Sequence, residues 1–181
     1  MDWGNYLFGF GGRINRAKMW LYLLVVLGAE IVFFAIMWAL AGMSGMMPLQ
    51  ENGSLVGVFS NGITGIIAGI LMFAFLVGLI WSGLAVAVKR LHDRNKSGWW
   101  LIFFYVGPLV LDAVVAIALP QGEKASAAPT LPALIAMLLA LTALGIMIWA
   151  FVEIYCLRGT VGGNRFGPDP IASELTVGPP P

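Results

Sequence analysis

The sequence predicts an all-α integral membrane protein with four transmembrane helices in two hairpins and with both termini cytoplasmic. Hydrophobic residues make up 60% of the 181-residue chain and charged residues only 10%. A soluble domain has about 45–50% apolar residues, glycine included, and about 25% charged residues. Because so small a globule could not hide this many apolar side chains, a soluble enzyme, a disordered protein and a nucleic-acid-binding protein are poor fits.

Four apolar stretches without lysine or arginine are long enough to cross about 30 Å of hydrocarbon at about 1.5 Å per residue. They cover residues 19–41, 63–88, 99–119 and 131–154. Continuous apolarity favours helices over barrel strands, which alternate between apolar and polar residues. In the third stretch, Gly107-Pro108 should loosen the helix. We expect a single membrane domain over residues 1–170, followed by a flexible proline-rich tail at residues 171–181.

The basic residues are distributed unevenly between the connections. Of the ten lysines and arginines, only Lys124 lies in the first or third connection. The others precede the first stretch, lie between the second and third stretches, or follow the fourth. Cytoplasmic loops carry the excess of lysine and arginine. The distribution therefore predicts that both termini and the middle loop are cytoplasmic.

Three polar segments fall on this predicted cytoplasmic side. The first, residues 10–20, contains two arginines three positions apart. The second, residues 89–100, contains a His-Asp pair and ends in two tryptophans. The third, residues 159–170, is too rich in glycine and proline for a helix. Seven side chains from these segments form the candidate site, which we call the cytoplasmic cap: Arg13, Arg16, Arg90, His92, Asp93, Asn164 and Arg165.

Together the three segments resemble a small bacterial inner-membrane family, domain of unknown function 805. The matching residues are Gly12-Arg13, Arg16 and Trp20, then Arg90-Leu91-His92-Asp93 with Ser97-Gly98-Trp99-Trp100, and finally Asn164 to Pro170. The resemblance extends over about residues 8–170 and implies a multi-pass protein of the bacterial inner (plasma) membrane. It implies no activity. Phe166 stands where the family commonly has tyrosine, so a role for a tyrosine hydroxyl could not apply here.

The pair His92-Asp93 has a catalytic and a structural interpretation. Zinc sites use three or four ligands, and the chain contains one histidine. A triad with Ser97 is disfavoured, because triads are assembled from distant parts of a fold. We expect instead that Asp93 pairs with Arg13 or Arg16 and that His92 bonds a backbone carbonyl. The sequence thus predicts no enzymatic activity, no metal and no cofactor.

The basic cluster has three interpretations, which the sequence leaves open. It is a topology signal, a surface for anionic lipid headgroups worth about 1 kcal/mol per basic residue, or a ligand site. In the last case Arg13, Arg16 and Arg90 would grip a phosphate or carboxylate in bidentate fashion.

Two carboxyl groups, Glu30 and Asp112, lie inside apolar stretches. Intramembrane carboxyls often mark ion paths. At helical rise, Glu30 lies roughly 16 Å and Asp112 roughly 20 Å from the cytoplasmic side, so the two could meet near the midplane. They predict, as the alternative function, a small proton-coupled transporter or channel.

The favoured function is that of a non-catalytic accessory or organising protein in the lipid bilayer. We expect its cytoplasmic cap to engage anionic lipid or a protein partner. The sequence predicts no nucleic-acid partner and leaves homo-oligomerisation open.

Overall fold

A computed structural model describes residues 2–43, 62–118 and 130–172. In these ranges the chain is helical and contains no β-strand. Three helices are long and apolar enough to cross a membrane, and a shorter apolar helix occurs at Ile102–Ile117. The long ones are Arg16–Ala39, Gly65–Asp93 and Leu131–Cys156. The all-α membrane class is therefore confirmed. Most of the predicted tail and the first and third connections lie outside the described residues.

The chain divides into two compact units. The first comprises Met1–Gly9 with Trp20–Ala85, and the second comprises Phe10–Met19 with Val86–Pro181. Each unit is described by itself. The single domain predicted over residues 1–170 stays a prediction.

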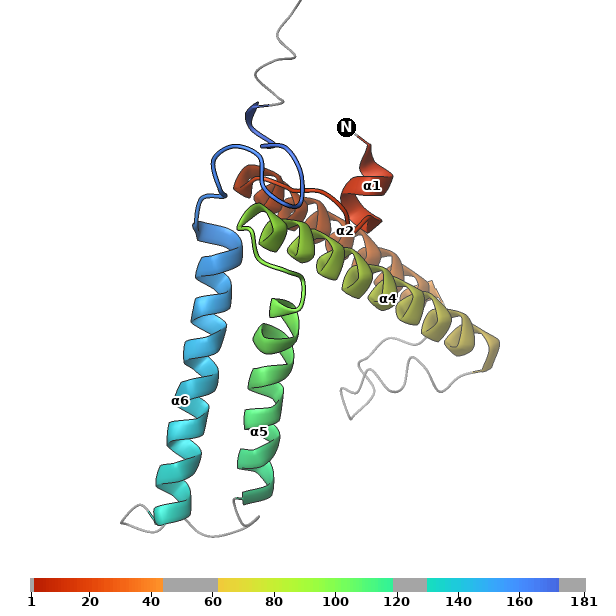
Figure 1. Cartoon of the computed structure of the whole chain (residues 1–181). Coiled ribbons are helices and arrows are strands. Elements are labelled where there is room, and N and C mark those ends of the chain that lie inside the picture. The colour runs from red at the N-terminus through yellow and green to blue at the C-terminus, as the bar shows by residue number, and fades with distance from the viewer. Residues whose placement is uncertain (1, 44–61, 119–129, 173–181) are drawn as a thin grey trace, which may run out of the picture. The chain divides into compact units, whose positions relative to one another are not determined.

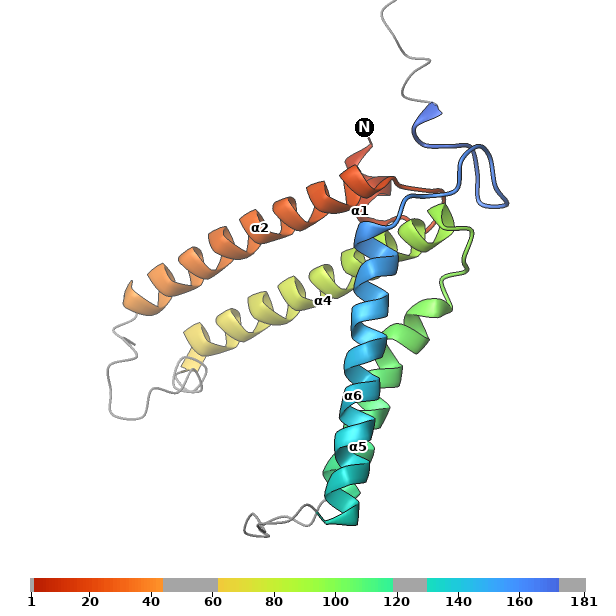
Figure 2. The same cartoon turned by 90° about the vertical axis from the view of Figure 1, so that its left-hand side faces the viewer.

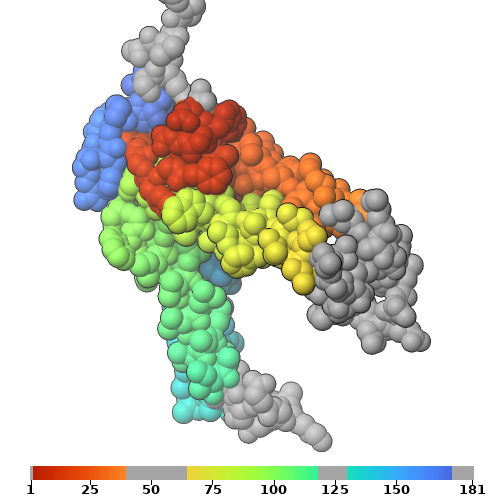
Figure 3. Space-filling model, turned by 90° about the vertical axis from the view of Figure 1, so that its right-hand side faces the viewer, coloured from red at the N-terminus to blue at the C-terminus, as the bar shows by residue number. Residues whose placement is uncertain are grey.

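The first unit contains residues 20–43 of α2 (Arg16–Met43) and residues 62–85 of α4 (Gly62–Asp93), which run side by side (Figures 1 and 2). The rings of Phe33 and Phe75 stack between them at 3.9 Å, and the hydroxyls of Tyr22 and Ser82 lie 3.1 Å apart. The short helix α1 (Trp3–Phe8) lies on α4, as the red and yellow surfaces of Figure 3 show. Large apolar side chains cover the outer faces of α2 and α4, as expected of helices that face lipid.

In the second unit, α5 (Gly107–Ala118) runs beside α6 (Leu131–Phe151) (Figures 1 and 2). A π-helical segment, η1 (Ile102–Val106), directly precedes α5. Its position has a simple cause. Pro108 has no N–H to donate to the fourth residue back, and the amide of Gly107 bonds to the carbonyls of Ile102 and Phe103. The predicted loosening at Gly107-Pro108 thus takes the form of a wider helical turn.

A second π-helical segment, η2 (Val152–Cys156), closes α6 on the side of the polar segments. Helix α4 also ends there, five residues later than the predicted stretch. Lys89 and Arg90, which the sequence analysis placed in a connection, are helical and buried. The end of α4 is a Schellman motif: Asn95 has a φ of 57°, and the amides of Asn95 and Lys96 bond to the carbonyls of His92 and Leu91.

Candidate functional site

The carboxylate of Asp93, at the end of α4, is the centre of the cytoplasmic cap. Its Oδ1 accepts hydrogen bonds from Nε and Nη2 of Arg13 at 3.2 and 3.0 Å, and its Oδ2 accepts one from Nη1 of Arg90. All three side chains are at most 3% exposed. The pairing of Asp93 with Arg13 was predicted and is present. The second partner, Arg90, was not foreseen, because no local pattern indicates that α4 continues so far.

Arg13 joins the first polar segment to the third. Its Nη1 donates to the carbonyls of Gly162 and Gly167, and its Nη2 to the carbonyl of Thr160 at 2.6 Å. A buried charge is stable only when it is paired and hydrogen-bonded, and every nitrogen of this guanidinium has a protein acceptor. Arg13 is therefore part of the structure of the cap.

Arg90 joins α4 to the end of α6. Its Nε donates to the carbonyl of Ile154 at 2.9 Å and its Nη2 to that of Leu157. The last carbonyls of a helix lack partners inside the helix. Arg90 supplies donors for these carbonyls while its charge neutralises the carboxylate of Asp93.

The third polar segment folds around the end of α4. The amide and hydroxyl of Thr160 both donate to the carbonyl of Asp93, at 2.8 and 3.0 Å. The side-chain amide of Asn164 donates to the carbonyl of His92 and to the hydroxyl of Thr160, each at 2.9 Å. A Cβ built on Gly159 would overlap the carboxylate of Asp93, so the close approach of this segment requires glycine.

The ring of His92 is held by two contacts. Its Nδ1 donates to the carbonyl of Gly12 at 3.2 Å, as predicted, and its ring stacks on Phe166 at 3.9 Å. The guanidinium of Arg165 lies 4.6 Å from the centre of the same phenyl ring and donates to the carbonyl of Asn95. Phe166 has no hydroxyl, so its ring is held in the cap by the stacking on His92 and the contact with Arg165.

Glu153 belongs to the cap although the sequence analysis did not include it in the candidate site. Its side chain, 4% exposed, accepts from Nε of Arg94 and pairs with Nζ of Lys96, both at 3.0 Å. Lys96 also lies 4.8 Å from the ring centre of Trp100. The signal available in the sequence was an acidic residue at the end of an apolar stretch on the basic side.

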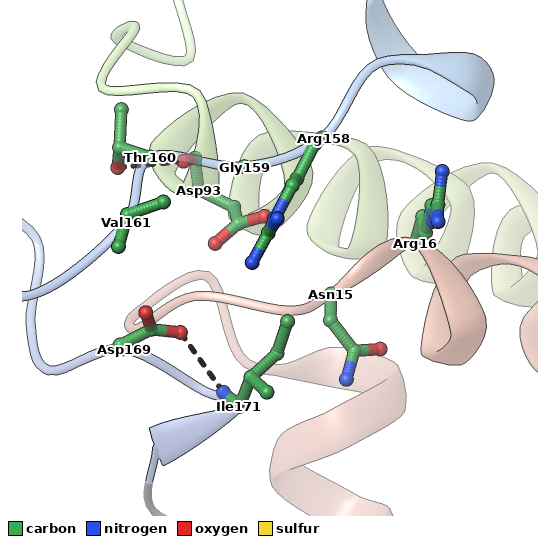
Figure 4. A pocket seen from close by; sticks show the side chains of 9 residues that line it. All are labelled: Asn15, Arg16, Asp93, Arg158, Gly159, Thr160, Val161, Asp169 and Ile171. Atoms are coloured by element: carbon green, nitrogen blue, oxygen red, sulfur yellow. Dashed lines mark hydrogen bonds between the residues drawn. The ribbon is translucent and has the colours of Figure 1, made fainter.

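A cavity of about 240 Å³ opens beside Asp93 within the second unit (Figure 4). The remaining cap residue, Arg16, lies at its α2 edge, and Arg158 extends into it between Asp93 and Asn15. Within the described residues neither guanidinium donates to a protein acceptor. The lining comprises Asn15, Arg16, Asp93, Arg158, Gly159, Thr160, Val161, Asp169 and Ile171.

Asp169 fixes the loop that bounds this cavity. Its carboxylate accepts from the backbone amides of Ile171 at 3.0 Å and Gly162 at 2.9 Å. These two hydrogen bonds to the charged form hold the pKa of Asp169 below its usual value of 3.8. The carboxylate is thus engaged with the backbone.

The two carboxyl groups predicted to lie inside the membrane, Glu30 and Asp112, belong to different units. Glu30 lies in α2, where its residue is half-buried, and Asp112 lies in α5, where its residue is exposed. Their meeting stays a prediction. Among the described residues there is no group of three or more histidine, cysteine, aspartate or glutamate side chains that could hold a metal ion.

Comparisons with known proteins show the family of this chain. The model of a family described as "Protein of unknown function (DUF805)" matches residues 7–168. The chain belongs to the DUF805 family. The matched region includes all seven predicted cap residues, and the resemblance stated from the three polar segments is confirmed.

The relatives of this DUF805 protein are bacterial. Inner membrane protein YhaH of Escherichia coli is 30% identical over 94% of this chain and 97% of its own length. Uncharacterized protein YiiR of the same species is 32% identical over 91% and 88%. Inner membrane protein YhaI is 24% identical over 92% and 88%. With its apolar helices, this chain is an inner-membrane protein. No solved structure matches it.

Proposed function

We propose that this DUF805 protein is a non-catalytic, four-span accessory or organising protein of the inner membrane. Its rigid cytoplasmic cap engages anionic lipid headgroups. The observation that carries the proposal is the meeting of all three polar segments at Asp93. Its carboxylate pairs with Arg13 and Arg90, and its main-chain carbonyl accepts from the backbone amide of Thr160. The cap therefore lies on one side of the membrane.

The number of crossings follows from where the helices leave and rejoin the cap. Helix α2 starts beside the cap at Arg16, and α4 returns to it at Asp93. Helix α6 ends in the cap and is long enough to cross. Because the chain leaves the cap before α5, the part between the cap and α6 has to cross as well. The chain then crosses the membrane an even number of times, which supports four spans in two hairpins.

The chemistry of the cap supports a structural role over a catalytic one. The carboxylate of Asp93 is occupied by two arginines, and the ring of His92 is fixed by Gly12 and Phe166. General acid–base catalysis needs a group within hydrogen-bond reach of a substrate proton. These groups instead bond to the protein, which favours a scaffold.

Lipid headgroups suit the outer surface of such a cap. Trp99 is 77% exposed next to the basic loop, and tryptophan is enriched at the headgroup level of membranes. Arg16 and Arg158 are exposed and have no protein acceptor within the described residues. Each basic residue near an anionic surface gains about 1 kcal/mol, or about fivefold in affinity.

Lipid selectivity of the full chain tests this function. The protein is placed in nanodiscs with equal amounts of phosphatidylglycerol and phosphatidylcholine, and the lipids retained after release are identified by native mass spectrometry. We expect phosphatidylglycerol to be retained about fivefold or more over phosphatidylcholine, and the preference to fall with salt. Equal retention of the two lipids would overturn the lipid proposal.

The topology is tested separately by cysteine labelling in cells. Cys156 is replaced by serine, and single cysteines are introduced as Gly163→Cys and Lys124→Cys. A membrane-impermeant maleimide should label the second variant from the periplasm and the first only after permeabilisation. Periplasmic labelling at residue 163 contradicts the proposed orientation.

A further inference from the structure

The cavity beside Asp93 provides a specific site for a phosphate group. We propose that this cavity binds a phosphate between the guanidinium groups of Arg158 and Arg16, as a lipid headgroup phosphodiester or as free phosphate. The inference deepens the proposed function and rests on it for the lipid form of the ligand. It replaces the ligand site expected from Arg13, Arg16 and Arg90, because two of those three arginines are used inside the protein.

The distribution of donors separates Arg16 and Arg158 from the other arginines of the second unit. Within the described residues every other arginine there donates to a protein oxygen, namely Arg13, Arg90, Arg94 and Arg165. Arg16 and Arg158 do not, and both line the same cavity. The side chain of Arg158 extends into that cavity (Figure 4). An arginine fork matches phosphate oxygens in bidentate geometry.

The charges around the cavity also favour an anion. Asp93 lines it, but both of its oxygens are already bonded to arginines. The second lining carboxylate, Asp169, accepts from two backbone amides. Arg13 and Arg90 together exceed the charge of Asp93 by one, which offsets Asp169. Arg16 and Arg158 therefore add positive charge that no described carboxylate compensates.

Size and polarity fit a phosphate as well. A water occupies about 30 Å³, so a cavity of about 240 Å³ has room for a phosphate and part of an attached group. The Oδ1 of Asn15 accepts from the amide of Lys18 at 2.8 Å and caps α2. Its side-chain amide remains as a neutral donor at the cavity.

Arg16 is the first residue of α2, and the first turn contains no acidic residue. A cation at a helix N-terminus is unfavourable unless an anion is nearby.

The test uses the full-length protein with two probes. Inorganic phosphate is titrated by calorimetry into protein in a neutral detergent, and phosphatidylglycerol retention is measured from nanodiscs by native mass spectrometry. The variants are Arg158→Gln and Arg16→Gln. The comparison variant, Arg165→Gln, removes the same charge from the third polar segment, outside the cavity. Circular dichroism and elution volume confirm that each variant folds.

We expect each cavity variant to lose about tenfold or more in affinity for the active probe, since hydrogen bonds to charged groups are strong. Arg165→Gln, whose guanidinium donates to Asn95 outside the cavity, should lose no more than the about fivefold that one basic residue near an anionic surface contributes. If the cavity variants lose affinity only for phosphatidylglycerol, the ligand is a headgroup phosphodiester. If they lose affinity only for inorganic phosphate, the ligand is free phosphate. The affinity of Arg158→Lys should lie between those of the wild type and Arg158→Gln, because lysine keeps the charge and loses the bidentate fork of arginine.

Two results would overturn the site. In the first, neither probe distinguishes Arg158→Gln from the wild type. In the second, Arg165→Gln loses as much as the cavity variants, so that only overall charge matters. If all variants keep both the wild-type preference for phosphatidylglycerol and the wild-type affinity for inorganic phosphate, the cavity proposal fails while the proposed function stands. If the wild type itself shows no preference, the proposed function fails, and the phosphate arm alone decides the cavity.

Discussion

Replacing Asp93 with asparagine removes the one negative charge that two buried arginines share. The side chains of Arg13, Asp93 and Arg90 are 1%, 3% and 0% exposed. Breaking a buried ion pair by neutralising one partner costs about 3–5 kcal/mol, because the remaining charge is left uncompensated. The substituted side chain would also turn an amide donor toward either Arg13 or Arg90, where a carboxylate oxygen now accepts. We therefore expect Asp93→Asn to lower the free energy of unfolding by about 3–5 kcal/mol.

Glu153→Gln is the matched comparison for this prediction. Glu153 is as buried as Asp93, but its partners Arg94 and Lys96 are each 26% exposed and can be hydrated when the charge is lost. We expect a cost of about 1 kcal/mol. Reversible unfolding in mixed micelles, followed by tryptophan fluorescence, measures both variants. If Asp93→Asn costs no more than Glu153→Gln, then the two-arginine cluster is not the centre of the cap.

Three further perturbations follow from the same geometry. Gly159→Ala should destabilise the cap by about 1–3 kcal/mol, because the new Cβ would overlap the carboxylate of Asp93; Gly163→Ala, whose nearest atom is 3.9 Å away, is the control in the same unfolding assay. Arg90→Lys should cost about 2 kcal/mol or more, since lysine cannot serve the carboxylate and two carbonyls with a rigid fork, and a cost below about 0.5 kcal/mol contradicts that role. Because folding lowers the pKa of Asp169, the stability that its carboxylate gives to the loop is fully present above the unfolded value of 3.8 and is lost as pH falls through the lower folded pKa. Proteolysis of the third polar segment should therefore accelerate only in acid below 3.8. Asp169→Ala should accelerate the same proteolysis at neutral pH.

Much of the fold follows from the sequence because the bilayer imposes simple rules. An apolar stretch without basic residues has to be a helix of about the thickness of the hydrocarbon. The described helices cover the predicted stretches 19–41, 63–88 and 131–154, and a shorter apolar helix at Ile102–Ile117 covers most of 99–119. The errors lie at the polar ends. Helix α4 runs to Asp93 rather than residue 88 because Arg90 finds a carboxylate and two carbonyls, which compensate for the loss of its hydration.

The site was only partly predictable for a different reason. The pairing of Asp93 with Arg13 could be expected, since few acids lie among many cations on that side. Arg158, in contrast, has no local signal, because its position depends on how a glycine-rich segment folds back over α4. The contacts of that segment join residues more than sixty positions apart. Helical periodicity carries no information about them.

The same basic residues act first as the topology signal and later as the structural core of the cap, so these two roles are not alternatives. Apart from Asp93, the acceptors that bury Arg13 and Arg90, from Ile154 to Gly167, come after α6 in the chain. During synthesis both arginines precede these acceptors. They are then hydrated cations, which is the state in which the positive-inside rule acts. Only when α6 has been added can the third polar segment close on Asp93. In the proposed topology, charges that first hold the helices in one orientation are thereby withdrawn into the cap, and Arg16 and Arg158 are left to act on an external anion.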